Sequence, residues 1–138
     1  MNLQRVLKEQ QKQYGRAHPL VADTLDTMAQ TLSSQGNDDG ALEKYRQLLA
    51  VLEAVPGEAR HEKVADAYWC IGALDRKAGR LSEAKESFSK TQEIYLQQLG
   101  ENHPKTVAAN AQLQSCLTGI LKRAVHASTV AAKSGLGR

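Results

Sequence analysis

Residues 57–104 read GEARHEKVADAYWCIGALDRKAGRLSEAKESFSKTQEIYLQQLGENHP, and this stretch decides the fold. Near each end of the stretch a glycine is followed by a histidine: Gly57 by His61, and Gly100 by His103. A related phrase lies upstream, so that His18, His61 and His103 are separated by 43 and then 42 residues. The glycine in the middle of the stretch, Gly79, also has a counterpart 43 residues earlier. A fixed period of this length indicates stacked structural repeats.

The segments between the glycines have the periodicity of amphipathic helices. From Val21 to Leu32 the apolar residues follow an i, i+3, i+4, i+7 spacing, which places them on one face of an α-helix. Three further segments, up to residue 95, repeat this spacing. Pro19 and Pro104 suit the first turn of a helix, where no backbone donor is missed. Each unit is therefore predicted to be an antiparallel hairpin of two helices, and hairpins must stack to bury their apolar faces.

Composition favours a single helical domain. The 138 residues contain one phenylalanine and one tryptophan, and no apolar run reaches membrane-spanning length. The first residues show neither a secretory signal core nor a typical transit segment.

Two cysteines suggest a reducing compartment. Residues 1–101 carry 13 basic and 15 acidic side chains, whereas residues 102–138 carry five basic and no acidic ones.

The unit of 42 or 43 residues resembles the tetratricopeptide repeat, in the longer form found in kinesin light chains. The linker of that form reads Leu-Gly, variable residues, His-Pro, and residues 99–104 read LGENHP. Other family positions are matched once in each complete unit. They are the small residue of the first helix (Ala29, Gly72), the turn glycine (Gly36, Gly79), the second-helix alanine (Ala41, Ala84) and the second-helix aromatic (Tyr45, Phe88).

The resemblance implies an all-α fold: a right-handed α-α superhelix, or tetratricopeptide-repeat solenoid, of antiparallel helical hairpins with a C-terminal capping helix. We expect one repeat domain over residues 1–132 and a flexible tail over 133–138. The expected parts are a half repeat (2–14), complete repeats (19–55 and 61–99) and a half repeat with a long or kinked capping helix (104–132).

Three residues of the second repeat depart from the family pattern. Asp75 stands where a packed apolar residue is usual, Thr91 where alanine is preferred, and Glu62 replaces the linker proline. The second repeat is therefore expected to be the less regular of the two.

The resemblance also implies a concave groove lined by the first helix of each repeat. The expected partner-binding residues are Asp23, Asp26, Thr27, Gln30, Asp66, Trp69, Ala73, Arg76, Lys77 and Gln112. Kinesin light chains often carry paired asparagines in the middle of this helix. Here those places hold Asp26-Thr27, Trp69-Cys70 and Ala111-Gln112, so the cargo specificity of kinesin light chains is not expected.

Trp69 is the strongest candidate for a binding anchor. The apolar periodicity assigns Tyr68 to the core, so Trp69 should point to another face, and an exposed tryptophan in a groove is a typical hot spot. The alternative is that Trp69 packs against the next repeat. Arg76 and Lys77 are candidates for pairing with an acidic partner, or else form a solvated helix end favoured by the helix dipole.

No pattern of catalytic, metal-binding or cofactor-binding residues stands out. Three of the four histidines belong to the repeated linker, and no cysteine and histidine cluster has zinc spacing. Cys70 and Cys116 lie on neighbouring first helices and are expected to be free thiols, although a close approach stays open. The glycines follow the repeat and not a phosphate-binding loop. We therefore expect no enzyme activity, no cofactor, no metal and no small-molecule substrate.

These features predict an intracellular, cytoplasmic scaffold or adaptor that binds a protein or peptide in its groove, within a larger complex. Import into an organelle after loss of a targeting segment stays open. One alternative is a structural subunit of a multiprotein or ribonucleoprotein assembly, docked through its convex face and ends. RNA contact by the basic C-terminal segment is a weaker alternative, because that segment lacks aromatics for base stacking. A regulatory domain of a longer chain is a further one.

Overall fold

The computed structural model describes residues 3–15, 18–54 and 59–136, and nearly all of these residues are helical. These residues form six helices and no strand, which confirms the all-α fold. The helices are α1 (Leu3–Tyr14), α2 (Pro19–Ser34), α3 (Asp38–Ala54), α4 (Ala59–Lys77), α5 (Leu81–Leu99) and α6 (Pro104–Leu136).

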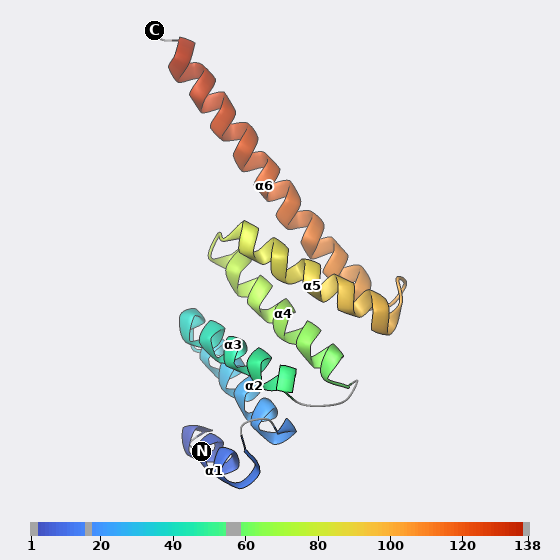
Figure 1. The fold of residues 1–138 in the computed structure, drawn as a ribbon. Coiled ribbons are helices and arrows are strands. Elements are labelled where there is room, and N and C mark those ends of the chain that lie inside the picture. Colours follow the sequence, from blue (N-terminus) through green and yellow to red (C-terminus); the bar gives the residue numbers. More distant parts are fainter. Residues whose placement is uncertain (1–2, 16–17, 55–58, 137–138) are drawn as a thin grey trace.

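The helices stack in chain order along one axis (Figure 1). Helices α2 and α3 form one antiparallel hairpin, and α4 and α5 form the next. Helix α1 packs on α2, α3 packs on α4, and α6 packs on α5. This arrangement agrees with the predicted helical hairpins, and their division into complete and half repeats stays a prediction. The right-handed sense of the superhelix stays a prediction.

Both hairpin turns use a glycine in the left-handed region, as the repeated glycines predict. Gly36 has a φ of 80° and Gly79 a φ of 85°, values that side chains disfavour. In each turn the following residue closes the helix end: the amide of Asn37 donates to the carbonyl of Leu32 (2.9 Å), and the amide of Arg80 to that of Asp75 (2.8 Å). Two identical closures, 43 residues apart, end the first helix of each repeat in the same way.

The linker histidines have a structural role that the sequence pattern alone did not reveal. The Nδ1 of His18 accepts a hydrogen bond from the amide of Leu20 (3.1 Å), and the Nδ1 of His103 accepts one from the amide of Lys105 (3.1 Å). Each histidine thus satisfies one of the free amides at the start of a helix, directly before a proline in the first helical position. The linker over residues 55–58, including Gly57, lies outside the described residues.

The core is continuous through the first hairpin and α4 and then divides into smaller clusters. Side chains of α1, α2, α3 and α4 form the first cluster, in which Leu25 and Leu52 are fully buried. Two further clusters lie among α4, α5 and α6, one around Tyr95 and one around Phe88. Gly72 lets the ring of Phe88 approach the α4 backbone, because a Cβ there would lie 3.0 Å from ring carbons.

Two departures from the family pattern are explained by polar contacts in the core. Asp75 is 3% exposed, and its carboxylate accepts a hydrogen bond from the Nε of Arg80 at 2.8 Å. The buried hydroxyl of Thr91 lies 3.1 Å from the carbonyl oxygen of Ala65, on the neighbouring helix. Both polar groups are therefore satisfied inside the second repeat.

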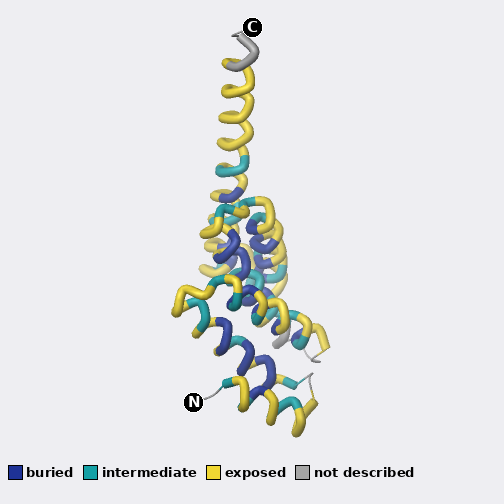
Figure 2. The backbone as a smooth tube through the Cα atoms, turned by 90° about the vertical axis from the view of Figure 1, so that its left-hand side faces the viewer, coloured by how far each residue is buried: buried dark blue, intermediate teal, exposed yellow. Residues whose placement is uncertain are grey.

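Helix α6 is one continuous helix of 33 residues. It runs to Leu136, four residues beyond the predicted end at residue 132 and into the predicted flexible tail, and it continues through Gly119, where a kink was an alternative. Figure 2 shows that the buried residues lie in the stacked part of the chain and that the far half of α6 is exposed.

Candidate functional site

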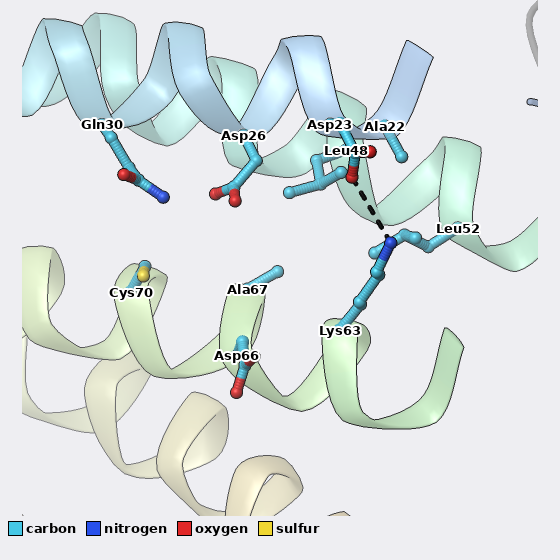
Figure 3. Close-up of a pocket in the computed structure, with 10 residues that line it drawn as sticks. All are labelled: Ala22, Asp23, Asp26, Gln30, Leu48, Leu52, Lys63, Asp66, Ala67 and Cys70. Atoms are coloured by element: carbon cyan, nitrogen blue, oxygen red, sulfur yellow. Dashed lines mark hydrogen bonds and ion pairs between the residues drawn. The ribbon is translucent and has the colours of Figure 1, made fainter. Parts of the chain in front are cut away.

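The first helices of the repeats, α2, α4 and α6, bring side chains to three neighbouring hollows. The first, of about 270 Å³, lies between α2 and α4 over the α3 side chains Leu48 and Leu52 (Figure 3). Its polar lining consists of Asp23, Asp26, Gln30, Lys63, Asp66 and Cys70. We call it the acidic hollow, because three of its four charged side chains are aspartates.

The other two hollows lie between α4 and α6 and share Trp69 as a wall. One, of about 380 Å³, is lined by Asp66, Trp69, Cys70, Tyr95, Lys105 and Ala108. The other, of about 340 Å³, is lined by Trp69, Ala73, Arg76, Lys77, Phe88 and Gln112. We call them the Tyr95 hollow and the basic hollow. The Tyr95 hollow shares Trp69 with the basic hollow, and Asp66 and Cys70 with the acidic hollow, so the three form one surface, which we call the groove.

Nine of the ten predicted groove residues line these hollows. The exception is Thr27, which is exposed and whose hydroxyl donates to the carbonyl of Asp23 (3.0 Å) within its own helix. The structure therefore assembles the predicted side chains on one surface. Their contact with a partner stays a prediction.

Trp69 combines the two alternatives that the sequence left open. Its ring stands edge-on to the ring of Phe88, with centroids 5.4 Å apart and planes at 80°. It is half-buried and also packs beside Tyr95 and Leu113, yet it lines two hollows. A tryptophan held by neighbours with one face open loses little entropy when a ligand covers that face. The assignment of Tyr68 to the core was wrong: Tyr68 is half-buried, and the Nζ of Lys90 lies 4.9 Å from its ring centre.

Lysines cross from one repeat to the previous one along the acidic side of the groove. The Nζ of Lys63 lies 3.3 Å from the carboxylate of Asp23, and that of Lys105 lies 3.6 Å from the carboxylate of Asp66. Asp23 and Asp66 are 43 residues apart, and Lys63 and Lys105 are 42 apart. The same ion pair therefore joins each first helix to the next, as a repeated feature of the solenoid.

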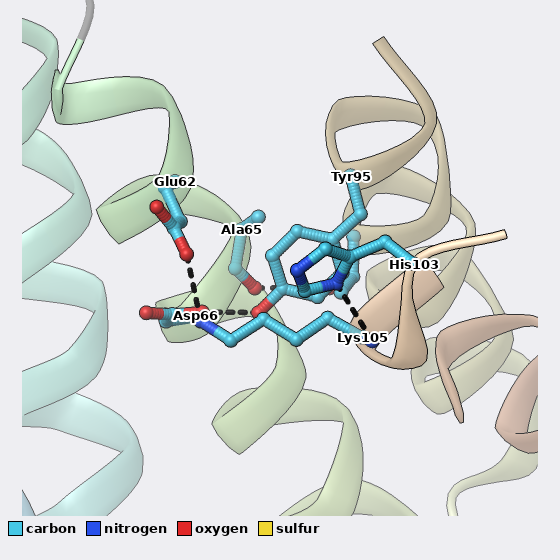
Figure 4. A network of polar contacts seen from close by, with 7 residues as sticks. Glu62, Ala65, Asp66, Tyr95, His103 and Lys105 are labelled. Atoms are coloured by element: carbon cyan, nitrogen blue, oxygen red, sulfur yellow. Dashed lines mark hydrogen bonds and ion pairs between the residues drawn. The ribbon is translucent and has the colours of Figure 1, made fainter. Parts of the chain in front are cut away.

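Lys105 is the centre of a polar network at the second of these junctions (Figure 4). It donates to Glu62 at 2.7 Å, and the hydroxyl of Tyr95 donates to Asp66. The Lys105 ammonium lowers the pKa of the Glu62 carboxyl, and this hydrogen bond in turn raises the pKa of Lys105. Burial and the neighbouring Asp66 raise the pKa of the Tyr95 hydroxyl, so that it stays a donor at neutral pH.

Asp26 keeps its charge available in the acidic hollow. Among the described residues it has no ion-pair partner, whereas Asp23 and Asp66 are each near a lysine. Cys70 lies close by, and burial raises the pKa of its thiol, so the neutral form dominates. Cys116 is buried elsewhere, beside Phe88, and both thiols are free.

The basic hollow is partly organised by contacts between helices. The guanidinium of Arg76 donates to the side-chain oxygen of Gln112 on α6. The Nζ of Lys77 lies 3.1 Å from the carboxylate of Asp38 at the start of α3. These two cations are therefore held by neighbouring helices and are not a merely solvated helix end. Gln112 is neutral, so this contact does not offset the charge of Arg76, whereas the pair with Asp38 offsets that of Lys77.

The sequence pattern did not single out Lys63, Tyr95 or Lys105 as residues of the groove. Lys63 and Lys105 had a signal, since each stands two positions after a linker histidine and they are thus equivalent by the repeat. Tyr95 had none, because a second-helix aromatic is normally read as core and its hydroxyl reaches the groove only through the packing of α5 on α4.

The described part of the chain contains no group of three or more His, Cys, Asp or Glu side chains placed to hold a metal ion. Across the same residues, no helix combines the length and apolarity needed to cross a membrane.

Comparisons with known proteins agree with the repeat architecture. Residues 1–54 match the family model described as tetratricopeptide repeat. The chain is also 28% identical, over 93 residues, to a protein of Candida albicans (strain SC5314 / ATCC MYA-2876) named "Clustered mitochondria protein homolog". That match covers 67% of this chain and 7% of the relative, so the matched segment is a small part of that longer relative.

Proposed function

We propose that this chain, which is a tetratricopeptide-repeat protein, binds an extended segment of a partner protein along its groove. Repeats of this family generally mediate contacts between proteins, which supports a binding role for this chain. The proposed role is that of an intracellular scaffold or adaptor that contributes affinity and no reaction. Two free cysteines agree with a reducing compartment.

The observation that carries the proposal is the position of Trp69 between hollows of different character. The Tyr95 hollow is lined by Trp69, Tyr95 and Ala108, which suits an apolar or aromatic side chain. A fully covered tryptophan of this kind is a frequent centre of binding energy, with charged contacts arranged around it.

The charges on either side of Trp69 give the groove a direction. The acidic hollow contains Asp26, which has no ion-pair partner in the part of the chain that the structure describes, and the basic hollow contains Arg76 and Lys77. A partner segment that carries Lys or Arg at one end and Asp or Glu at the other would place opposite charges in both hollows. Such complementarity selects the partner and its orientation more than it adds affinity.

The test is a peptide library displayed on phage and selected against the intact chain. We expect selected peptides to share an apolar residue between a basic and an acidic position, and to change the fluorescence of the only tryptophan. Trp69→Ala should weaken binding by about 2 kcal/mol or more, whereas Trp69→Phe should retain most of it. Asp26→Asn should weaken binding of peptides with the basic residue and leave a peptide without it unaffected.

Glu93→Gln is the matched control, since Glu93 is an exposed carboxylate of α5 that lines none of the three hollows. Selected peptides that bind Trp69→Ala and the original chain equally well would overturn the groove as the binding surface.

A further inference from the structure

A row of large apolar side chains on α6 is exposed to solvent. Val107, Leu117, Leu121 and Val125 are 54%, 40%, 64% and 57% exposed. The last three recur every four residues, and at 100° per residue all four fall within one narrow face of the helix. We call this face the α6 stripe. It is distinct from the groove, which α6 lines through Lys105, Ala108 and Gln112.

The repeat explains what normally covers this face. Val107 and Leu117 stand 42 residues after Ala65 and Asp75 of α4. Ala65 and Asp75 are buried, and α5 packs over α4 on the side of Gly72, whose backbone touches the ring of Phe88. On α4 the part of this face that corresponds to Val107 and Leu117 is therefore covered by the second helix of the repeat, whereas Leu121 and Val125 lie beyond the length of α4. On α6 no helix among the described residues covers it.

A hollow continues the α6 stripe toward α5. It measures about 380 Å³ and is lined by Gln92 and Leu96 of α5, by Glu101 and Asn102 of the turn, and by Thr106, Val107 and Asn110 of α6. The hydroxyl of Thr106 is buried, with no hydrogen-bond partner among the described residues. An apolar edge beside a buried, unsatisfied polar group is typical of a surface that another element completes.

The charge of the segment selects the kind of occupant. Residues 102–138 hold five basic and no acidic side chains. Lys122 stands one position after Leu121, and Lys133 projects from the same side of the helix, so cations border one edge of the stripe. A second copy of α6 would bring cations against cations. A helix with acidic flanks would place opposite charges beside Lys122 and Lys133.

We propose that the α6 stripe docks an amphipathic helix of a partner protein whose apolar residues are flanked by Asp and Glu. The partner helix lies alongside α6, where α5 lies alongside α4, and it covers the hollow beside Leu96. Two features argue for a helix and against a lipid surface: the stripe contains no aromatic side chain, and alanines at 124 and 132 beside it allow two helices to approach closely.

The experiment uses the full chain and a fluorescent synthetic helix of about 20 residues, which matches the exposed length of α6. One probe carries leucines along one face and glutamates beside them, and a second probe carries lysines instead. We expect the glutamate probe to bind, to bind more weakly as salt rises from about 50 to about 300 mM, and to bind at least tenfold more tightly than the lysine probe.

Leu121→Gln with Val125→Gln should weaken the glutamate probe by about tenfold or more, since it removes the apolar contact from an exposed part of the helix. Val130→Gln is the matched control: Val130 is also exposed, but it lies nine residues from Leu121, on the opposite face of α6. Trp69→Ala should leave this binding unchanged, which separates the stripe from the groove.

Three results would overturn the proposal. The first is equal binding of the two probes. The second is a dimer in sedimentation equilibrium that the Leu121 and Val125 substitutions abolish, since the occupant would then be a second copy. The third is binding to phosphatidylserine vesicles, but not to the glutamate probe, in a manner that depends on the same two residues.

Discussion

Replacing Gly72 by alanine tests whether α4 and α5 pack as closely as the structure shows. An added Cβ would lie 3.0 Å from two ring carbons of Phe88 and 3.1 Å from a third. The ring has little room to retreat, because Phe88 is 1% exposed and is enclosed by Trp69, Cys116 and Ala84. The substitution therefore adds a methyl group to a filled core.

Two effects of opposite sign decide the outcome. Alanine is better than glycine inside a helix by about 1 kcal/mol. Overpacking of a filled core costs about 1–3 kcal/mol. We expect the second effect to prevail, with a net loss of about 1 kcal/mol in the free energy of unfolding. For a domain of this size that loss corresponds to a decrease of about 3–5 °C in melting temperature.

The assay is urea unfolding, followed by far-ultraviolet circular dichroism and by the fluorescence of Trp69, which touches the Phe88 ring. Phe88→Leu, which shortens the side chain facing the new methyl group, should reduce the penalty of Gly72→Ala. The double variant should be more stable than the sum of the single changes predicts, by about 0.5 kcal/mol or more.

The control comes from the preceding repeat, where Ala29 occupies the position of Gly72 and is fully buried. Ala29→Gly should lose about 1 kcal/mol or more, because it lowers helix propensity and removes a packed methyl group. If Gly72→Ala instead stabilised the chain by about 1 kcal/mol, as on an open helix surface, the close approach of Phe88 would be refuted.

Three further predictions concern the helix cap, the polar network and the thiols. His103→Ala should reduce the free energy of unfolding by about 0.5–2 kcal/mol. His103→Asn should retain most of the stability, because asparagine, like histidine, can accept a hydrogen bond from the amide in the first turn of α6. An equal loss in both variants, measured by thermal unfolding, would contradict the capping role. Lys105→Ala should cost less than about 1 kcal/mol, since its pair with Glu62 is exposed. Lys105 lowers the pKa of Glu62, so the stability difference between the original chain and Lys105→Ala should be present at neutral pH and vanish as the pH falls below about 4. The difference is measured as a shift of the urea midpoint, and a shift that does not depend on pH would argue against the pair. Alkylation by iodoacetamide, followed by mass spectrometry, should leave the buried Cys116 unmodified in the folded chain. The alkylation rate of Cys70 should keep rising with pH above about 8.5, where an exposed thiol is half ionised. A plateau of that rate at about pH 8.5 would contradict the raised pKa of Cys70.

The groove was predictable as a set of positions but not as a set of contacts. Asp23 and Asp66 were identified because the repeat places them on the same face of successive helices. Their lysine partners depend on the offset between one repeat and the next, which no pattern within a helix encodes. Tyr68 and Trp69 illustrate the same limit: adjacent residues differ by 100° around a helix, so a small error in the assumed core direction exchanges their roles.

The sequence by itself determined the helices, their turns and their repetition. Glycines at fixed spacing, prolines in first turns and an apolar period of 3.6 residues act locally, so they can be recognised without knowledge of the fold. Tertiary structure alone decided how a buried Asp75 is satisfied, how Lys105 joins two repeats, and that the α6 stripe is exposed. Those outcomes depend on the distance between helices that are far apart in the chain, and that distance is set by the packing of whole hairpins.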